Sequence, residues 1–336
     1  PLGFAFFSFG TILPTFLRHC GADDRTVGAL TAVNALIVFL PGLFVVRYLR
    51  RLPRVRAYVF WVGLVERLAL LPLAPAALAW GRDRPQWVVA TAFACVFLHS
   101  LAMGVNMPAY WILIGKCVAP RWRGRLYGFA GGAAGVLGIG VEQVLRRVVL
   151  GGANDGFPDG YARGFVLGFV VLTVSLLPFL WTREPLSAPV APDEAGGGDG
   201  LRRADLRALW RDDPPFRRLL QGQIVFVLAG MAGPFFVLHA REALLAPPGA
   251  VAVYTGATIF ASAFGSLVCG ALADRFGNRP VLLAAMGVGG LSTVAALLLA
   301  HPTVFALVFL LSAGALAGVG IAANNLVMEF AGDPHR

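Results

Sequence analysis

Charge is scarce in this sequence. Charged residues make up 14% of the 336 residues, whereas a soluble domain carries about 25%. Hydrophobic residues make up 57%, and the mean hydropathy is +0.72. This composition leaves too little polar surface for a soluble domain and predicts a polytopic membrane protein. The net charge of +10 does not indicate nucleic-acid binding, because that needs a basic face on a soluble fold and these arginines lie between apolar runs.

Motifs that bind metals or carry out catalysis are missing as well. The four cysteines show no CxxC pair and no Cys/His spacing, so we predict buried thiols, no metal site and no cofactor. They are Cys20, Cys95, Cys117 and Cys269. No paired catalytic carboxylates, His-x4-Asp motif or nucleophile elbow is present. We therefore predict no catalytic residues and no enzymatic activity; a membrane-bound acyl or glycosyl transferase is the least favoured alternative.

Long apolar runs are abundant. A bilayer core of about 30 Å needs about 20 apolar residues per helix. Runs this continuous favour helices over barrel strands, which alternate over about 10 residues. We predict an all-α polytopic membrane protein with about ten transmembrane helices, the first of them short. They are expected at 2–17, 27–47, 56–79, 87–113, 124–146, 162–181, 216–238, 250–272, 280–300 and 303–328.

The basic residues are distributed unevenly between alternate loops. With the N-terminus placed inside, the inner segments hold 19 of the 28 Lys and Arg residues and the outer segments hold 8. Cytoplasmic loops of membrane proteins are enriched in these residues. We therefore predict a multi-pass protein of a bacterial-type inner (plasma) membrane with its N-terminus in the cytoplasm.

The longest polar segment divides the apolar runs into six and four. Residues 182–215 begin with a Pro/Gly/Ala-rich stretch that is typical of a flexible linker. In 201–213 the apolar residues fall near one helical face, which predicts a short amphipathic helix on the inner membrane surface; a solvated turn is the alternative. We expect an N-terminal six-helix bundle at 1–181, a cytoplasmic linker at 182–215 and a truncated C-terminal bundle of four helices at 216–336.

The two groups of runs contain an internal repeat. Residues 42–52 align with residues 270–280, and residues 104–122 align with residues 318–336. The first alignment pairs Gly42 with Gly270, Arg47 with Arg275, and Arg51 with Arg279. Both alignments fall at equivalent places in the order of spans, which indicates two related halves with the same direction through the membrane. Parallel halves are found in one large class of transporters, with binding near the membrane midplane.

The segment GALADRFGNRPVL (270–282) resembles the G-x-L-a-D-r-x-G-r-k-x-x-l loop signature of the major facilitator superfamily. The matching positions are Gly270, Leu272, Asp274, Arg275, Gly277, Arg279 and Leu282. Glu329 and Arg336 resemble the Glu-x6-Arg pattern that some members carry after their tenth span. The resemblance covers the whole chain. It implies a two-bundle fold of twelve helices, of which spans eleven and twelve are missing here.

The resemblance implies that this loop controls an inner gate. Gly277 would permit a tight turn with positive φ, Gly270 would let helices approach closely, and Asp274 would pair with an arginine or with the N-terminus of span eleven. The predicted gating residues are Gly270, Asp274, Arg275, Gly277, Arg279, Glu329 and Arg336. The alternative is that these residues only anchor the topology. The degenerate N-terminal copy consists of Gly42, Arg47 and Arg51. Its loops contain no acid, so an acid–base latch is expected only in the C-terminal half.

Polar residues inside predicted spans are candidates for function. The candidates for binding a solute or a proton are His99, Glu66, Arg67, Asn34, Asn106 and Glu142. The resemblance implies that spans 1, 4, 7 and 10 line the central cavity, with spans 2, 5 and 8, whereas spans 3, 6 and 9 are peripheral. His99 would then lie on a cavity helix. For Glu66 we favour a structural role, in which it pairs with Arg67 or another helix.

Together these features predict a secondary active transporter that moves a small solute by alternating access. A coupling ion, where one is used, would be a proton or sodium. The other expected partner is membrane lipid, and we expect a monomer. A receptor-like or chaperone-like member that has kept the fold and lost transport is the alternative.

Overall fold

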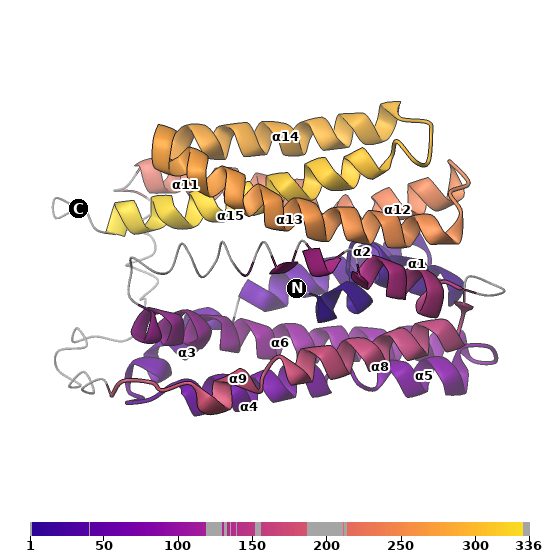
Figure 1. Cartoon of the computed structure of the whole chain (residues 1–336), viewed down its shortest axis with the longest axis horizontal. Coiled ribbons are helices and arrows are strands. Elements are labelled where there is room, and N and C mark those ends of the chain that lie inside the picture. Colours follow the sequence, from indigo (N-terminus) through magenta and orange to yellow (C-terminus); the bar gives the residue numbers. More distant parts are fainter. Residues whose placement is uncertain are drawn as a thin grey trace. The chain divides into compact units, whose positions relative to one another are not determined.

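The computed structural model describes residues 2–39, 41–118, 130, 133–134, 136–138, 140–151, 156–186, 211 and 214–331. Throughout these residues the chain forms helices and turns and contains no β-strand, so the all-α prediction is confirmed (Figure 1).

The described helices fall into two series along the chain. The first series is η1 (Gly3–Phe7), α1 (Ile12–His19), α2 (Asp24–Phe39), α3 (Gly42–Arg50), α4 (Arg56–Leu68), α5 (Leu73–Trp80), α6 (Pro85–Cys117), η2 (Leu145–Val149), α8 (Asp159–Val174) and α9 (Pro178–Trp181). The second series is α11 (Pro214–Gly230), α12 (Gly233–Glu242), α13 (Pro248–Phe276), α14 (Asn278–Leu298) and α15 (Ala306–Ala331). Helix η1 is a 3-10 helix and η2 is a π-helix.

Eight helical segments in the described residues are long and apolar enough to cross a membrane. They are Asp24–Val46, Arg56–Trp80, Pro85–Cys117, Asp159–Trp181, Arg217–Glu242, Pro248–Phe276, Asn278–Leu298 and Ala306–Leu326. Each coincides with one of the ten predicted spans. The predicted span at 124–146 is described only in part, at residues 130, 133–134, 136–138 and 140–146, and most of the predicted amphipathic helix at 201–213 lies outside the described residues.

The first predicted span, 2–17, is not one continuous helix, and the prediction is wrong in this respect. A 3-10 helix ends at Phe7, and α1 starts afresh at Ile12. Pro14 has no N–H to donate to the Gly10 carbonyl, which removes a hydrogen bond that a continuous helix would need. The chain instead closes the break with a bond from the Leu13 N–H to the Ser8 carbonyl (2.9 Å).

The chain divides into two compact units, one of residues 1–127 and 143–198 and the other of residues 128–142 and 199–336. The main division, after residue 198, falls inside the predicted linker. The second unit also takes up part of the predicted fifth span. There the described Gly138 lies against Ile259 of α13, and the side chain of Glu142 lies against Gly256 of the same helix.

In the first unit, α6 is the central helix and packs against α2, α3, α4 and α5. Its contact with α2 is a close approach of two backbones, because a Cβ atom at Gly104 would lie 2.5 Å from the carbonyl oxygen of Val38. Small residues at such crossings are characteristic of membrane helices.

A glycine stripe on α8 forms a second close contact of the first unit. A Cβ atom at Gly164 would lie 2.7 Å from Cγ2 of Val149 in η2. One turn further on, a Cβ atom at Gly168 would lie 2.6 Å from the Phe7 ring and 2.8 Å from Cβ of Phe6 in η1. The interrupted first span and the π-helix therefore both pack closely on glycines of α8.

In the second unit, α13, α14 and α15 lie side by side (Figure 1). Near one end of this unit, the rings of Tyr254 and Phe309 stack with their centroids 4.6 Å apart, and Phe305 packs edge-on to both. The Tyr254 hydroxyl donates to the carbonyl of Pro302 (2.7 Å). These contacts fix the end of the unit opposite the turn between α13 and α14.

The glycine stripe gives a stability prediction. Gly168→Ala should destabilise the protein by about 1–3 kcal/mol, the usual cost of overpacking, because the new methyl group collides with Phe6 and Phe7. Gly287→Ala in α14 is the matched control, since a Cβ atom there would meet no atom within 4 Å. The control should be neutral or stabilise by up to about 1 kcal/mol. Thermal unfolding of both variants in one detergent measures the difference, and a Gly168→Ala protein at least as stable as wild type contradicts this packing.

Candidate functional site

The charged loop at 270–282 is a sharp junction between two long helices. Helix α13 ends at Phe276, and α14 begins at Asn278. Between them Gly277 has φ = +87°, the positive value predicted from the sequence, and its N–H donates to the carbonyl of Ala273 (2.9 Å). A residue with a Cβ atom adopts this φ only with strain, so glycine at this position is what allows the two helices to join directly.

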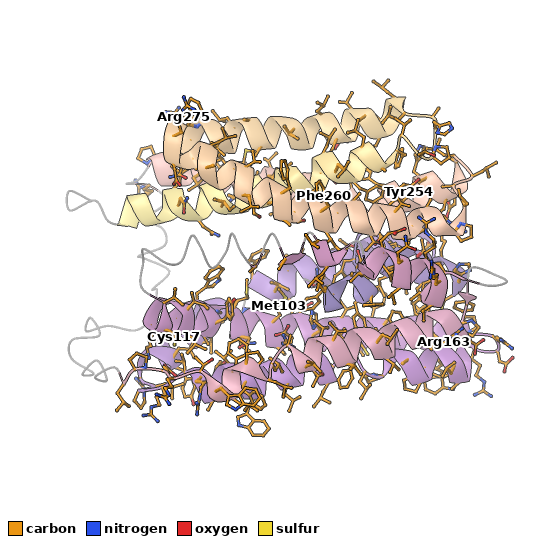
Figure 2. The ribbon with its side chains drawn as sticks, viewed as in Figure 1. Met103, Cys117, Arg163, Tyr254, Phe260 and Arg275 are labelled. Atoms are coloured by element: carbon orange, nitrogen blue, oxygen red, sulfur yellow. The ribbon has the colours of Figure 1, made fainter. Side chains whose placement is uncertain are left out.

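The charged side chains of this loop are exposed. Asp274, Arg275 and Arg279 are all exposed, and Figure 2 shows Arg275 at one end of the second unit. Within the described part of the chain, the Asp274 carboxylate forms no ion pair. The Arg275 guanidinium lies 5.4 Å from the ring centroid of Phe276. The loop thus carries charges of both signs that form no ion pair with the described residues.

Of the remaining predicted gating residues, only Gly270 is fully described. A Cβ atom at Gly270 would meet nothing within 4 Å, so the predicted close helix approach at this glycine is wrong for the described structure. Glu329 belongs to α15, but its side chain is outside what the structure describes, as is all of Arg336. Sequence analysis did not find the bond that links the loop to α15, in which Asn325 Nδ2 donates to Asn278 Oδ1 (3.0 Å).

The N-terminal copy of the loop follows a different pattern. A Cβ atom at Gly42, the first residue of α3, would lie 3.3 Å from the carbonyl oxygen of Gly104 in α6. Arg51 is exposed just beyond the end of α3, and the side chain of Arg47 lies outside the described residues. The copy therefore packs α3 on α6 without an acid of its own.

Glu184 supplies an acid to this end of the first unit, and the prediction that an acid–base contact exists only in the C-terminal half is wrong. The Glu184 carboxylate follows α9 and accepts hydrogen bonds from the backbone N–H groups of Val55 (2.9 Å) and Arg56 (2.8 Å), at the start of α4. It also pairs with Lys116, the only lysine of the chain, at 3.0 Å. Sequence analysis missed this contact because it assigned Glu184 to the linker.

The surroundings of Glu184 favour its ionised form. Its side chain is only 1% exposed, and this burial acts to raise its pKa. The hydrogen bonds from Val55 and Arg56 and the charge of Lys116 outweigh burial, so the pKa lies below the ordinary glutamate value. An anion at a helix N-terminus is also favoured by the helix dipole. The Arg56 guanidinium further ties α4 to the same segment by donating to the carbonyl of Thr182 (2.9 Å).

Four of the six intramembrane candidates form one buried polar cluster. The Glu66 carboxylate pairs with Arg67 (3.0 Å) and accepts a bond from Asn106 Nδ2 (3.2 Å). The Arg67 guanidinium also donates to the carbonyl of Gly63 (2.9 Å). The ring nitrogen Nδ1 of His99 lies 3.1 Å from the backbone carbonyl of Glu66. The pairing of Glu66 with Arg67 within α4 agrees with the structural role that the sequence favoured. The contacts of Asn106 and His99 with Glu66 bring α6 and α4 together.

The cluster contains two further acceptor atoms. A carbonyl oxygen can only accept, so Nδ1 of neutral His99 carries the hydrogen and Nε2 presents a lone pair. The imidazole has aromatic neighbours, since the rings of Phe4 and Phe9 are centred 5.5 Å and 6.4 Å from its centroid. Asn106 Oδ1 is buried and has no partner within the described structure. An unpaired buried acceptor such as Asn106 Oδ1 is costly, and it is a place where a hydrogen-bond donor can bind.

The other two candidates lie elsewhere. Asn34 of α2 accepts a hydrogen bond from the hydroxyl of Ser100 in α6 (2.9 Å), which is an interhelical contact. Glu142 belongs to the second unit and lies against α13. In the described part of the chain, no group of three His, Cys, Asp or Glu residues could hold a metal ion.

Comparison with known proteins gives two findings. The family model for the Major Facilitator Superfamily matches residues 160–336, which include the charged loop. A crystal structure of a D-xylose-proton symporter is similar to this structure, with a TM-score of 0.63 and 14% sequence identity over 96% of this chain and 79% of the symporter chain. No curated protein sequence matches the chain.

The two findings agree with the helices described above. The family match covers more than half of the chain, and the similarity to the symporter extends the same fold over nearly all of it. The eight membrane-crossing helices and the loop with Gly277 at its turn fit this family. The chain is thus an integral multi-pass membrane protein that belongs to the major facilitator superfamily.

Proposed function

We propose that this protein is a secondary active transporter that moves a small solute by alternating access, with the loop at 270–282 as part of its inner gate. The observation that carries the gating proposal is the state of this loop. Asp274, Arg275 and Arg279 are exposed on a rigid junction, and the Asp274 carboxylate has no ionic partner among the described residues. Such charges can form ion pairs in one state of a transporter and release them in another.

The expected strength of these ion pairs is suitable for a gate. Exposed ion pairs contribute about 0–1 kcal/mol each, and partial desolvation in a closed gate makes them stronger. A few such pairs therefore bias a two-state equilibrium without locking it. Because Gly277 joins α13 to α14 without a flexible loop, movement of either helix carries the charges with it. We expect the two helices and the gate to move as one body, as rigid-body switching requires.

Glu184 has a complementary role in this proposal. It joins the segment after α9 to the start of α4 and to Lys116 near the end of α6. Three chain segments are thereby held together at the end of the first unit. We infer that this contact keeps the bundle end rigid while the gate opens and closes.

We further infer that transport is coupled to protons and that the acceptor is the cluster around Glu66. The similar fold of a D-xylose-proton symporter supports this choice of ion. The Arg67 guanidinium, 3.0 Å from the Glu66 carboxylate, disfavours a sodium ion there, and a proton binds Glu66 only when this ion pair opens. The few charges inside the membrane favour a solute without high charge.

The gate proposal predicts the behaviour of Asp274→Asn. Solutes are first screened for thermal stabilisation of the purified protein, because a ligand of the folded state raises its apparent stability. Uptake of a stabilising solute into proteoliposomes is then measured. Asp274→Asn should slow uptake at least about tenfold, the change expected from losing about 1.4 kcal/mol of gate bias. The exposed Asp83→Asn is the control and should transport normally. Wild-type uptake by Asp274→Asn contradicts a gating role, and no uptake by the wild type for any stabilising solute contradicts transport.

The contact of Glu184 predicts a pH-dependent stability. A carboxylate with a lowered folded-state pKa stabilises the fold above its unfolded pKa of about 4.3 and loses this effect as the pH falls through the folded value. Glu184→Gln should cost about 1–3 kcal/mol at neutral pH, because it removes a charged hydrogen-bond acceptor. The difference between the variant and the wild type should shrink as the pH falls below about 4.3. Thermal unfolding from pH 7 to pH 3 tests this, with Asp83→Asn as control; a constant difference across this range contradicts the assignment.

The coupling proposal predicts that Glu66→Gln changes the result of one transport assay and not of another. The side chain of Glu66→Gln is permanently neutral, like a protonated carboxyl, and cannot release a proton. The variant should lose solute accumulation driven by a pH gradient but keep solute exchange at equal pH. Asp83→Asn should retain both activities. If Glu66→Gln loses both in parallel, the Glu66–Arg67 pair is structural and the proton assignment is wrong.

A further inference from the structure

An apolar groove lies on the first unit, and none of its lining residues belongs to the buried polar cluster. It is formed by α5, η2 and the first turns of α8, and its volume is about 700 Å³. This volume lies within the range of about 300–1,000 Å³ that is typical of ligand sites. The groove is lined by Leu78, Val148, Asp159, Ala162, Arg163, Val166 and Leu167.

The walls of the groove belong to segments that cross the membrane. Leu78 lies in the span Arg56–Trp80, and Val166 and Leu167 lie in the span Asp159–Trp181. All three side chains are exposed. The π-helix η2 contributes Val148, and its neighbour Val149 is pressed against Gly164 of α8. The groove is therefore built by specific packing, and we expect its exposed apolar walls to face the hydrocarbon of the bilayer.

The polar residues of the groove carry an unbalanced positive charge. Asp159 is already paired with Arg82 (3.0 Å). Arg163 forms no salt bridge with any described residue; only its Nε donates, to the backbone carbonyl of Asp159 (3.2 Å). Its terminal nitrogens remain available, and Figure 2 shows Arg163 near the end of the first unit where α8 begins. An exposed guanidinium there lies close to the membrane–water interface.

We propose that this groove is a binding site for an anionic phospholipid. One acyl chain lies along Leu78, Val148, Val166 and Leu167, and the lipid phosphate pairs with the Arg163 guanidinium. Arginine matches phosphate oxygens with two parallel hydrogen bonds, and basic pockets between membrane helices bind anionic headgroups. The site is independent of the proposed transport activity, because it requires only that the first unit is embedded in a bilayer.

The test uses the full chain in detergent and photoactivatable phosphatidylglycerol with a diazirine on its acyl chain. Matched phosphatidylcholine carries the same chains. Peptide mapping should place the phosphatidylglycerol label on α5 and α8, and unlabelled phosphatidylglycerol should compete with it. Arg163→Gln should weaken phosphatidylglycerol binding about fivefold, as expected for one cation at an anionic headgroup. Arg84→Gln, which removes a nearby exposed arginine outside the groove, is the matched control and should bind as wild type.

A second variant tests the apolar part of the site. Val166→Trp should block labelling in the groove by both lipids, because the indole fills it. Inorganic phosphate should not compete at millimolar concentration, since it lacks the acyl chain. Equal labelling by both lipids in the wild type overturns the proposal, as does equal weakening by Arg84→Gln and Arg163→Gln or full competition by phosphate. If Arg163→Gln does not fold, the wild-type lipid comparison and Val166→Trp still decide the question.

Discussion

Helices in hydrocarbon gain little from burying apolar side chains against each other, because the lipid is equally apolar. This protein therefore depends on backbones that come close enough to pack. The face of α8 around Gly164 and Gly168 receives both η1 and η2 at distances where no side chain would fit. Gly104 lets α6 approach α2 in the same way. The apolar groove beside α8 and the position of the first span both follow from this close packing.

Polar contacts add specificity to that packing. Two examples in the first unit involve α4. The Glu66–Arg67–Asn106 cluster joins α4 to α6 inside the membrane, and Glu184 joins α4 and α6 to the segment after α9. In the second unit the corresponding charges at Asp274, Arg275 and Arg279 are exposed. One unit thus keeps its acid bound at a helix N-terminus, whereas the other presents an acid on an open turn, as the proposed gate requires.

Where the sequence and the structure differ, the reason is physical. The acid at the start of α4, Glu184, lies about 130 positions further along the chain. At that separation, the local sequence pattern contains no information about which residues are in contact. The break near Gly10 was missed because apolar composition alone does not distinguish one helix from two, although Pro14 was a visible signal. For Gly270, the motif suggested a close approach, but the described helices leave open space there.

The sequence by itself determined the membrane-embedded, all-helical nature of this protein, the positions of its eight described spans, the turn at Gly277 and the family. All of these follow from local properties: the length of an apolar run, a glycine at a positive φ and a short signature. The tertiary structure alone decided which polar groups meet, that Glu184 binds the start of α4, that His99 faces the backbone of Glu66, and that Arg163 lies at an apolar groove. Those facts depend on how close distant helices approach each other, and that distance is set by packing rather than by neighbours along the chain.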